Sequence, residues 1–152
     1  MGDYSLPLAN QTAVVTGASS GIGRAIATTF AQQGANLIIH ANTNQAGLEA
    51  TAAEIRDLGR DVTLLYADLT SEEAQTSLVE QAFQVNEQIN IWVNNAGRDV
   101  LTGDTADWSF EQKLAALWEL DVQGTIGICR GLSKPMIRIG KQANAVILNM
   151  GW

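Results

Sequence analysis

The sequence predicts an α/β fold of the Rossmann type, a doubly wound parallel sheet of about five strands with helices on both faces. Three observations support this prediction. Short apolar runs typical of buried strands alternate with segments whose apolar residues have helical spacing. A glycine-rich run connects the first predicted strand to the first predicted helix, and polar residues follow the later strands. Crossovers between parallel strands need long connections, usually helices. The 152 residues are enough for one domain, 1–152, with a sizeable core.

The first strand is predicted at 13–15, a buried apolar run, and a helix follows it until Gly34, a helix stop signal. Positions on one face of that helix are Ile22, Ala25, Ile26, Thr29 and Phe30. A second strand is expected at 36–40, and the next helix ends at Gly59. Its apolar face contains Leu48, Ala52, Ile55 and Leu58.

A third strand is predicted at 62–66, where β-forming residues gather. Thr70 to Glu73 form a capping-box pattern that opens a helix. The apolar positions of this helix are Leu78, Val79, Ala82, Phe83 and Val85. A fourth strand is expected at 91–93 and a fifth at 145–148, with a long helical region from near Asp107 between them. We expect Leu114, Leu117, Trp118, Ile126, Ile128 and Leu132 to be its packing residues.

Gly17, Gly21 and Gly23 lie in the turn between the first strand and the first helix. Glycine permits positive φ and lets a phosphate approach the backbone, and the N–H groups of a helix start favour an anion. The turn is therefore either an anion-binding turn or a bare tight turn. Its spacing differs from the Gly-x-Gly-x-x-Gly fingerprint, and it lacks the Gly-Lys-Ser/Thr of a P-loop.

Polar residues stand where three later strands end: Asp68, the run 94–97 and the run 149–152. In open α/β sheets, ligands bind at the carboxyl ends of the strands. We therefore expect these residues and the glycine turn to meet at one edge of the sheet.

With Thr-Gly-x-x-x-Gly-x-Gly at 16–23 and Asn-Asn-Ala-Gly at 94–97, the chain resembles the short-chain dehydrogenase/reductase family from about residue 8 to its last residue. The resemblance implies an NAD(P)-dependent oxidoreductase that transfers hydride between a nicotinamide cofactor and a carbonyl or alcohol substrate. It also implies that the cofactor's pyrophosphate and adenosine ribose are held by Gly17, Ser19, Ser20, Gly21, Ile22 and Gly23.

The resemblance gives Asp68 a hydrogen bond from the adenine amino group, with Leu69 supplying backbone contacts. The alternative for Asp68 is a turn residue or a charge at a helix start. Asn95, Ala96 and Gly97 would pass beneath the adenine ribose. Asn94 would instead tie neighbouring strands together through its amide.

The choice between NADP and NAD depends on the end of the second strand, where an acid would bind the ribose 2′-hydroxyl and repel a 2′-phosphate. Ala41 and Asn42 stand there, and the absence of an acid favours NADP. However, neither position 42 nor position 20 carries an Arg or Lys that would neutralise the 2′-phosphate, since the residues are Asn42 and Ser20. Arg24 is near in sequence and is either a phosphate ligand or a solvated helix residue.

The family's catalytic pattern is incomplete in these residues. Its Tyr is followed by Lys four positions on, whereas Tyr4 and Tyr66 are followed by Leu8 and Thr70. We therefore expect the chain to be the cofactor-binding part of a longer protein, truncated relative to the family.

Two further family positions are altered. The family's Asn falls on Asp121, which is either a catalytic group that accepts a hydrogen bond or carries a proton, or a packed helix residue. Its Ser falls on Trp152, whose indole cannot replace a hydroxyl. An impaired dinucleotide sensor or regulatory protein is therefore the alternative function, and a structural module that only keeps the fold is a third.

Composition narrows the function classes. The net charge of −7 argues against nucleic acid as a partner, and no run is long enough to cross a bilayer. Cys129 and His40 are the only residues of their types, so we expect no metal site and a buried structural thiol. The N-terminal residues resemble no secretory signal, so we expect a cytoplasmic protein.

The partners we expect are a small-molecule carbonyl or alcohol substrate and a second copy of the chain. A homo-oligomer is predicted because the fifth strand and the long helix would be left uncovered. Trp108, Phe110 and Trp118 either line a substrate pocket or, more commonly for aromatics at helical spacing, belong to the core.

Overall fold

The computed structural model describes residues 6–141 and 144–151 and confirms the Rossmann-type fold. All four strand pairings in the described sheet are parallel, in the order β3-β2-β1-β4-β5. The elements are β1 Thr12–Val15, α1 Gly21–Gln32, β2 Asn36–Ala41, α2 Gln45–Asp57, β3 Val62–Tyr66, α3 Glu72–Val85, β4 Ile91–Asn94, the 3₁₀ turn η1 Gly103–Thr105, α4 Phe110–Leu117, the π-helical η2 Trp118–Gly124, α5 Thr125–Gly140 and β5 Val146–Asn149.

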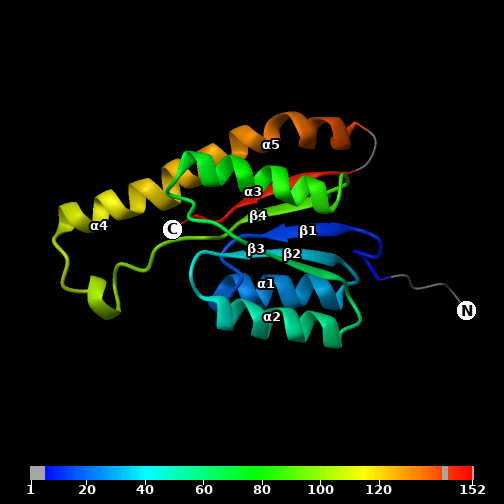
Figure 1. The fold of residues 1–152 in the computed structure, drawn as a ribbon, viewed down its shortest axis with the longest axis horizontal. Helices are drawn as coiled ribbons and strands as arrows, with labels where there is room; N and C mark the ends of the chain where they lie inside the picture. Colours follow the sequence, from blue (N-terminus) through cyan, green and yellow to red (C-terminus); the bar gives the residue numbers. More distant parts are fainter. Residues whose placement is uncertain (1–5, 142–143, 152) are drawn as a thin grey trace, which may run out of the picture.

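Helices cover both faces of the sheet: α1 and α2 lie on one side, and α3 and α5 on the other (Figure 1). Successive residues of a strand point to opposite faces. Val15 and Ile39 therefore belong to the core under α1 and α2, whereas Val14 and Ile38 belong to the core under α3 and α5. Because both faces are buried, these strands are apolar runs without alternation.

The strand order places a switch point between β1 and β4. From β1 the chain builds β2 and β3 on one side, and then returns to add β4 and β5 on the other. The connections after β1 and β4 consequently leave in opposite directions, which opens a crevice at the carboxyl ends of these two strands.

The predicted helix stops are confirmed. Gly34 and Gly59 lie just beyond α1 and α2, with φ of +100° and +72°. The predicted capping box at Thr70 is wrong by one residue. Ser71 directly precedes α3, is its N-cap and accepts a hydrogen bond from the backbone N–H of Ala74 at 3.3 Å, whereas the Thr70 hydroxyl donates to Asp68.

The long helix begins at Phe110, three residues after Asp107, with a capping box between Ser109 and Gln112. Ile128 and Leu132 are buried as predicted.

Other packing predictions for this helix are wrong. Leu114, Trp118 and Ile126 are 53%, 55% and 54% exposed, and Phe110 is 74% exposed, because no described element packs on that face. A core role for Phe110 and Trp118 is therefore excluded within the described chain, and Trp108 is half-buried.

In the described sheet β5 is an edge strand, and its Val146 and Leu148 are 43% and 44% exposed. Cys129 is half-buried, so the prediction of a buried thiol is wrong. Its Sγ lies 3.4 Å from Asn94 Nδ2 in a polar cluster at the end of the sheet. None of the helices that the structure describes is both long and apolar enough to cross a membrane.

Candidate functional site

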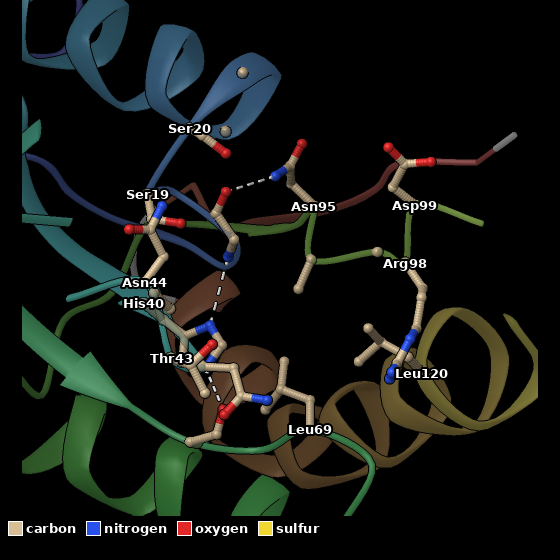
Figure 2. A pocket seen from close by; sticks show the side chains of 18 of the residues that line it. Ser19, Ser20, His40, Thr43, Asn44, Leu69, Asn95, Arg98, Asp99 and Leu120 are labelled. Atoms are coloured by element: carbon tan, nitrogen blue, oxygen red, sulfur yellow. Dashed lines mark hydrogen bonds between the residues drawn. The ribbon is translucent and has the colours of Figure 1, made fainter. Parts of the chain in front are cut away.

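A cavity of about 500 Å³ lies at the carboxyl ends of the central strands (Figure 2). All the residues predicted to hold a cofactor line it. These are Gly17, Ser19, Ser20, Gly21, Ile22, Gly23, Ala41, Asn42, Asp68, Leu69, Asn95, Ala96 and Gly97. The fold therefore brings together, as the sequence predicted, residues from the glycine turn and from the ends of β2, β3 and β4.

The glycine turn (residues 16–23) leaves no room for a side chain at Gly17 and Gly23, where it passes close to neighbouring groups. Gly17 has φ +67°, and a Cβ there would lie 2.8 Å from the Cα of Ala96. A Cβ at Gly23 would overlap the carbonyl oxygen of Gly17 and Nδ2 of Asn95. Glycine is therefore required at both positions by packing, independently of any ligand.

Helix α1 begins directly on the cavity. Its N-cap Ser20 makes no side-chain capping bond, and its described first turn contains no acidic residue. The N–H groups and the dipole of this helix start are therefore not neutralised by the chain itself, which is the condition for binding an anion there.

Thr16 and Asn95 join the ends of β1 and β4. The Thr16 hydroxyl oxygen accepts hydrogen bonds from the backbone N–H groups of Asn95 and Ala96, at 3.0 and 2.9 Å. In return, the Asn95 amide donates to the carbonyl oxygens of Thr16 and Gly17, at 3.0 and 3.3 Å. This clamp fixes the position of the glycine turn relative to the segment 95–97.

Asn94 ties strands together, as predicted. Its Nδ2 donates to Oδ1 of Asn149 on β5 at 2.8 Å, and its Oδ1 accepts a 2.9 Å bond from the indole N–H of Trp92. Its side chain is buried and serves the sheet.

Asp68 forms a turn and also lines the cavity. Its Oδ1 accepts hydrogen bonds from the Thr70 N–H at 3.1 Å and from the Thr70 hydroxyl at 2.8 Å. These two donors, the N–H first, hold the pKa of Asp68 below its usual value. The carboxylate is thus charged at neutral pH, and both predicted roles, turn residue and hydrogen-bond acceptor in the cavity, are compatible with its position.

The end of β2 presents neutral groups to the cavity. Ala41 and Asn42 are joined there by Thr43 and Asn44, and the Asn44 side chain caps α2 by accepting from the Gly47 N–H at 3.0 Å. Arg24 is absent from the described lining. Its guanidinium instead pairs with Glu54 of α2, which raises the pKa of Arg24 and supports the solvated-helix interpretation.

Several lining residues were not predicted from the sequence. They are His40, Thr43, Asn44, Ala67, Thr70, Arg98, Asp99 and Leu120. All except Leu120, which lies in η2, are within two residues of a predicted strand-end residue, so extending the strand-end motifs would have found them. Arg98 brings a guanidinium to the cavity, with its Cζ 5.8 Å from the centre of the Trp108 ring. Trp108 itself lines a smaller neighbouring cavity that also includes Arg98.

Asp121 lies in η2 and is absent from the described lining, although its neighbour Leu120 is part of it. Its Oδ1 accepts a 3.0 Å hydrogen bond from the backbone N–H of Arg98. The carboxylate therefore holds the segment that follows β4. Trp152, at the family's Ser position, lies outside the described residues. Within the described ranges no group of three or more His, Cys, Asp or Glu side chains is arranged to hold a metal ion.

Comparisons with known proteins agree with this geometry. The family described as short chain dehydrogenase matches residues 11–151. A 3-oxoacyl-[acyl-carrier-protein] reductase of Chlamydia trachomatis is 31% identical over 145 residues, which are 94% of this chain and 56% of the relative. A short-chain dehydrogenase of Penicillium roqueforti is also 31% identical, over 93% of this chain and 57% of its own length. The chain thus spans little more than half the length of these relatives.

Solved structures show the same fold. A metagenomic short-chain oxidoreductase in complex with NADP superposes with a TM-score of 0.79 at 27% identity, over 92% of this chain and 61% of that one. A putative short-chain alcohol dehydrogenase from Sinorhizobium meliloti gives a TM-score of 0.74 at 30% identity, over 88% of this chain and 52% of that one.

Proposed function

Since the chain belongs to the short-chain dehydrogenase family, we propose that its cavity holds a nicotinamide dinucleotide for hydride transfer to or from a carbonyl or alcohol substrate. The relatives named as reductases and dehydrogenases support this function over an impaired sensor.

The observation that carries the proposal is the fit between the glycine turn and a pyrophosphate. Gly21 has φ +53° with open space where a side chain would stand, and the uncapped start of α1 lies on the same cavity. A phosphate group would meet backbone N–H groups and a helix dipole there, with no acid of the first turn to repel it.

The remaining lining gives each part of the dinucleotide a partner. Asp68 would accept from the adenine amino group, with Leu69 beside it, and the backbone of 95–97 would support the ribose. Ser19, Ser20 and Ile22 would surround the pyrophosphate and adenosine ribose. The nicotinamide ring supplies the hydride acceptor or donor when the cofactor is bound.

We further propose that NADP is preferred to NAD. Neutral side chains at Ala41, Asn42 and Thr43 leave no carboxylate to repel a 2′-phosphate, and the neighbouring structure of the metagenomic oxidoreductase contains NADP. A second related structure, a short chain dehydrogenase from Burkholderia cenocepacia at 29% identity, also contains NADP. Arg24 is not needed for this preference, because it is paired with Glu54.

Asp121 acts, in this proposal, as a positioning residue. Its bond to the Arg98 N–H orders the segment that carries Ala96 and Gly97 along the cavity. Any effect of Asp121 on hydride transfer would therefore pass through the placement of this segment beneath the cofactor.

Titration calorimetry of the chain with NADPH and with NADH tests the proposal. We expect binding of both, with NADPH tighter, and a rise in melting temperature with each. Oxidation of bound NADPH by a panel of ketones and aldehydes then tests the activity. Absence of both heat and thermal shift with either dinucleotide would contradict cofactor binding.

A further inference from the structure

His40 lies next to the last residue of β2, and its imidazole is buried between the glycine turn and the end of β3. Its exposed fraction is only 2%. Nδ1 lies 3.4 Å from the backbone N of Gly17, and Nε2 lies 3.0 Å from the carbonyl oxygen of Ala67 (Figure 2). Because a backbone N–H can only donate, Nδ1 must be the acceptor and Nε2 must carry the proton. The two contacts together require one neutral tautomer.

The same residue also holds the turn through its backbone. The carbonyl oxygen of His40 accepts a 2.9 Å hydrogen bond from the N–H of Ala18. Gly17 and Ala18 are thus both bound to His40, one through the side chain and one through the main chain. Ala67, the third partner, directly precedes Asp68, so His40 joins the segments proposed to hold the pyrophosphate and the adenine.

We propose that His40 is a positioning residue for the dinucleotide: its neutral imidazole holds the glycine turn in place through Nδ1, and protonation of Nδ1 releases the turn and weakens cofactor binding. This inference rests on the proposed function. A second proton on the ring would place an N–H of the imidazolium against the N–H of Gly17, where an acceptor is required.

The surroundings of His40 set the pH range. Burial lowers the pKa of His40 from its usual value of 6.5, and the Ala67 carbonyl opposes this in part. The charged side chains on the neighbouring segments of the same cavity are Asp68, Asp99 and Arg98, and none of them is a cause of this shift. The imidazole of His40 is therefore in its neutral form at neutral pH. The affinity for cofactor is expected to fall only as the pH drops below 6.5, through the lowered folded-state pKa.

Two substitutions separate the two contacts of the ring. In His40→Asn the amide oxygen stands near Nδ1 and can still accept from Gly17, but the donor to Ala67 is lost. In His40→Gln the amide nitrogen stands near Nε2 and can still donate to Ala67, but the acceptor for Gly17 is lost. Both variants lose one buried hydrogen bond, so a purely structural role predicts similar losses of stability and of affinity.

The proposal predicts a different pattern, measured by calorimetry with NADPH. At neutral pH, His40→Gln weakens binding about two- to tenfold, as expected for one lost hydrogen bond, whereas His40→Asn binds within about twofold of wild type. From about pH 8 to about pH 5, the affinity of wild type falls, and that of His40→Asn, which has no titrating ring, falls less. Equal affinities of the two variants, or equal pH profiles of wild type and His40→Asn, would overturn it.

A cofactor-independent measurement separates this inference from the proposed function. Amide exchange at Gly17, followed by NMR in the free protein, should be faster in His40→Gln than in His40→Asn. If wild type binds neither dinucleotide, the proposed function fails and the cofactor role of His40 fails with it. If wild type binds normally but Gly17 exchanges equally fast in both variants, only the role of His40 fails. Should His40→Gln not fold, the pH profiles of wild type and His40→Asn still decide.

Discussion

Thr16 and Asn95 hold each other in a reciprocal set of hydrogen bonds: the Thr16 hydroxyl accepts from the Asn95 N–H, and the Asn95 amide donates to the Thr16 carbonyl, both at 3.0 Å. Each residue lies just beyond its strand, one after β1 and the other after β4. The two residues are 79 positions apart in the sequence. Their hydrogen bonds join the ends of β1 and β4 at the crevice where the proposed cofactor lies.

Thr16→Val should test how much this clamp contributes. Valine keeps the volume but removes the acceptor of the Asn95 and Ala96 N–H groups, and Thr16 is 1% exposed. We expect the free energy of unfolding to fall by about 1–3 kcal/mol, the cost of leaving buried donors unsatisfied. Urea denaturation measures this loss, and the affinity for NADPH should fall with it.

Thr16→Ser is the matched control, because it keeps the hydroxyl and loses only a methyl group. If the stability depends mainly on side-chain volume, the serine variant has the lower free energy of unfolding. If the hydroxyl decides, as we expect, the valine variant is less stable, and the opposite order would contradict the clamp.

Gly23→Ala should weaken cofactor binding strongly. The added Cβ would overlap the Gly17 carbonyl and the Asn95 amide, so the turn must move away from the position that faces a pyrophosphate. Calorimetry should show a loss of NADPH affinity of at least about tenfold, corresponding to about 1.4 kcal/mol.

Gly59→Ala provides the control for the cost of an ordinary glycine substitution. Gly59 has φ +72° and no atom within 4 Å of an added Cβ, and it is not among the described residues that line the cavity. This variant should lose stability by about 1–2 kcal/mol through backbone strain and still bind NADPH as wild type does. A Gly23→Ala protein that binds equally well would contradict the proposed place of the pyrophosphate.

The strand-end residues of the site could be predicted from the sequence because their spacing follows from the topology. Once strands and helices alternate, the carboxyl ends of parallel strands must lie at one edge, and Asp68 and Asn95 follow directly. The helix stops at Gly34 and Gly59 were predictable for a similar reason, since the cause is local.

The sequence could not decide features that depend on tertiary contacts. Thr70 and Ser71 are both suitable N-caps; in the structure Ser71 caps α3, and Thr70 instead belongs to the turn that Asp68 forms. The role of His40 depends on the approach of Gly17 and Ala67 from two other segments. Helical periodicity also marks Trp118 as a residue that packs, but does not say on what.

Asn42→Asp should reverse the proposed cofactor preference. A carboxylate at the end of β2 would repel a 2′-phosphate and could accept a hydrogen bond from a free ribose 2′-hydroxyl. We expect NADPH binding to weaken by about tenfold and NADH binding to hold or improve, as two charges a few ångströms apart near a surface can produce. The control is Gln32→Glu, which adds the same charge at the last residue of α1, at the end of this helix away from the cavity. It should change neither affinity. Parallel weakening of NADPH and NADH by Asn42→Asp would contradict a 2′-phosphate site there.

Asp121→Asn and Asp121→Ala should differ in cofactor binding. Asparagine keeps an oxygen that can accept from the Arg98 N–H, whereas alanine leaves this N–H without that acceptor and loosens the segment 96–98. We expect NADPH affinity near that of wild type for the asparagine variant and about two- to tenfold weaker binding for the alanine variant. If the asparagine variant binds as poorly as the alanine variant, the carboxylate's charge is required and the hydrogen bond to Arg98 does not explain its role.

The exposed apolar face of the long helix should make the chain self-associate. Phe110, Leu114 and Trp118 are more than half exposed, and large contiguous apolar surfaces of this kind mark protein interfaces. Light scattering should therefore give a mass above the 16.2 kDa of one chain, rising with concentration. Leu114→Ser combined with Trp118→Ser should shift the protein toward monomer, because removal of central apolar contacts weakens an interface most. Leu58→Ser, at the end of α2 on the other face of the sheet, removes an exposed leucine without touching this face and should leave the mass unchanged. A wild-type protein that stays monomeric at all concentrations would show that this face needs no second copy to cover it.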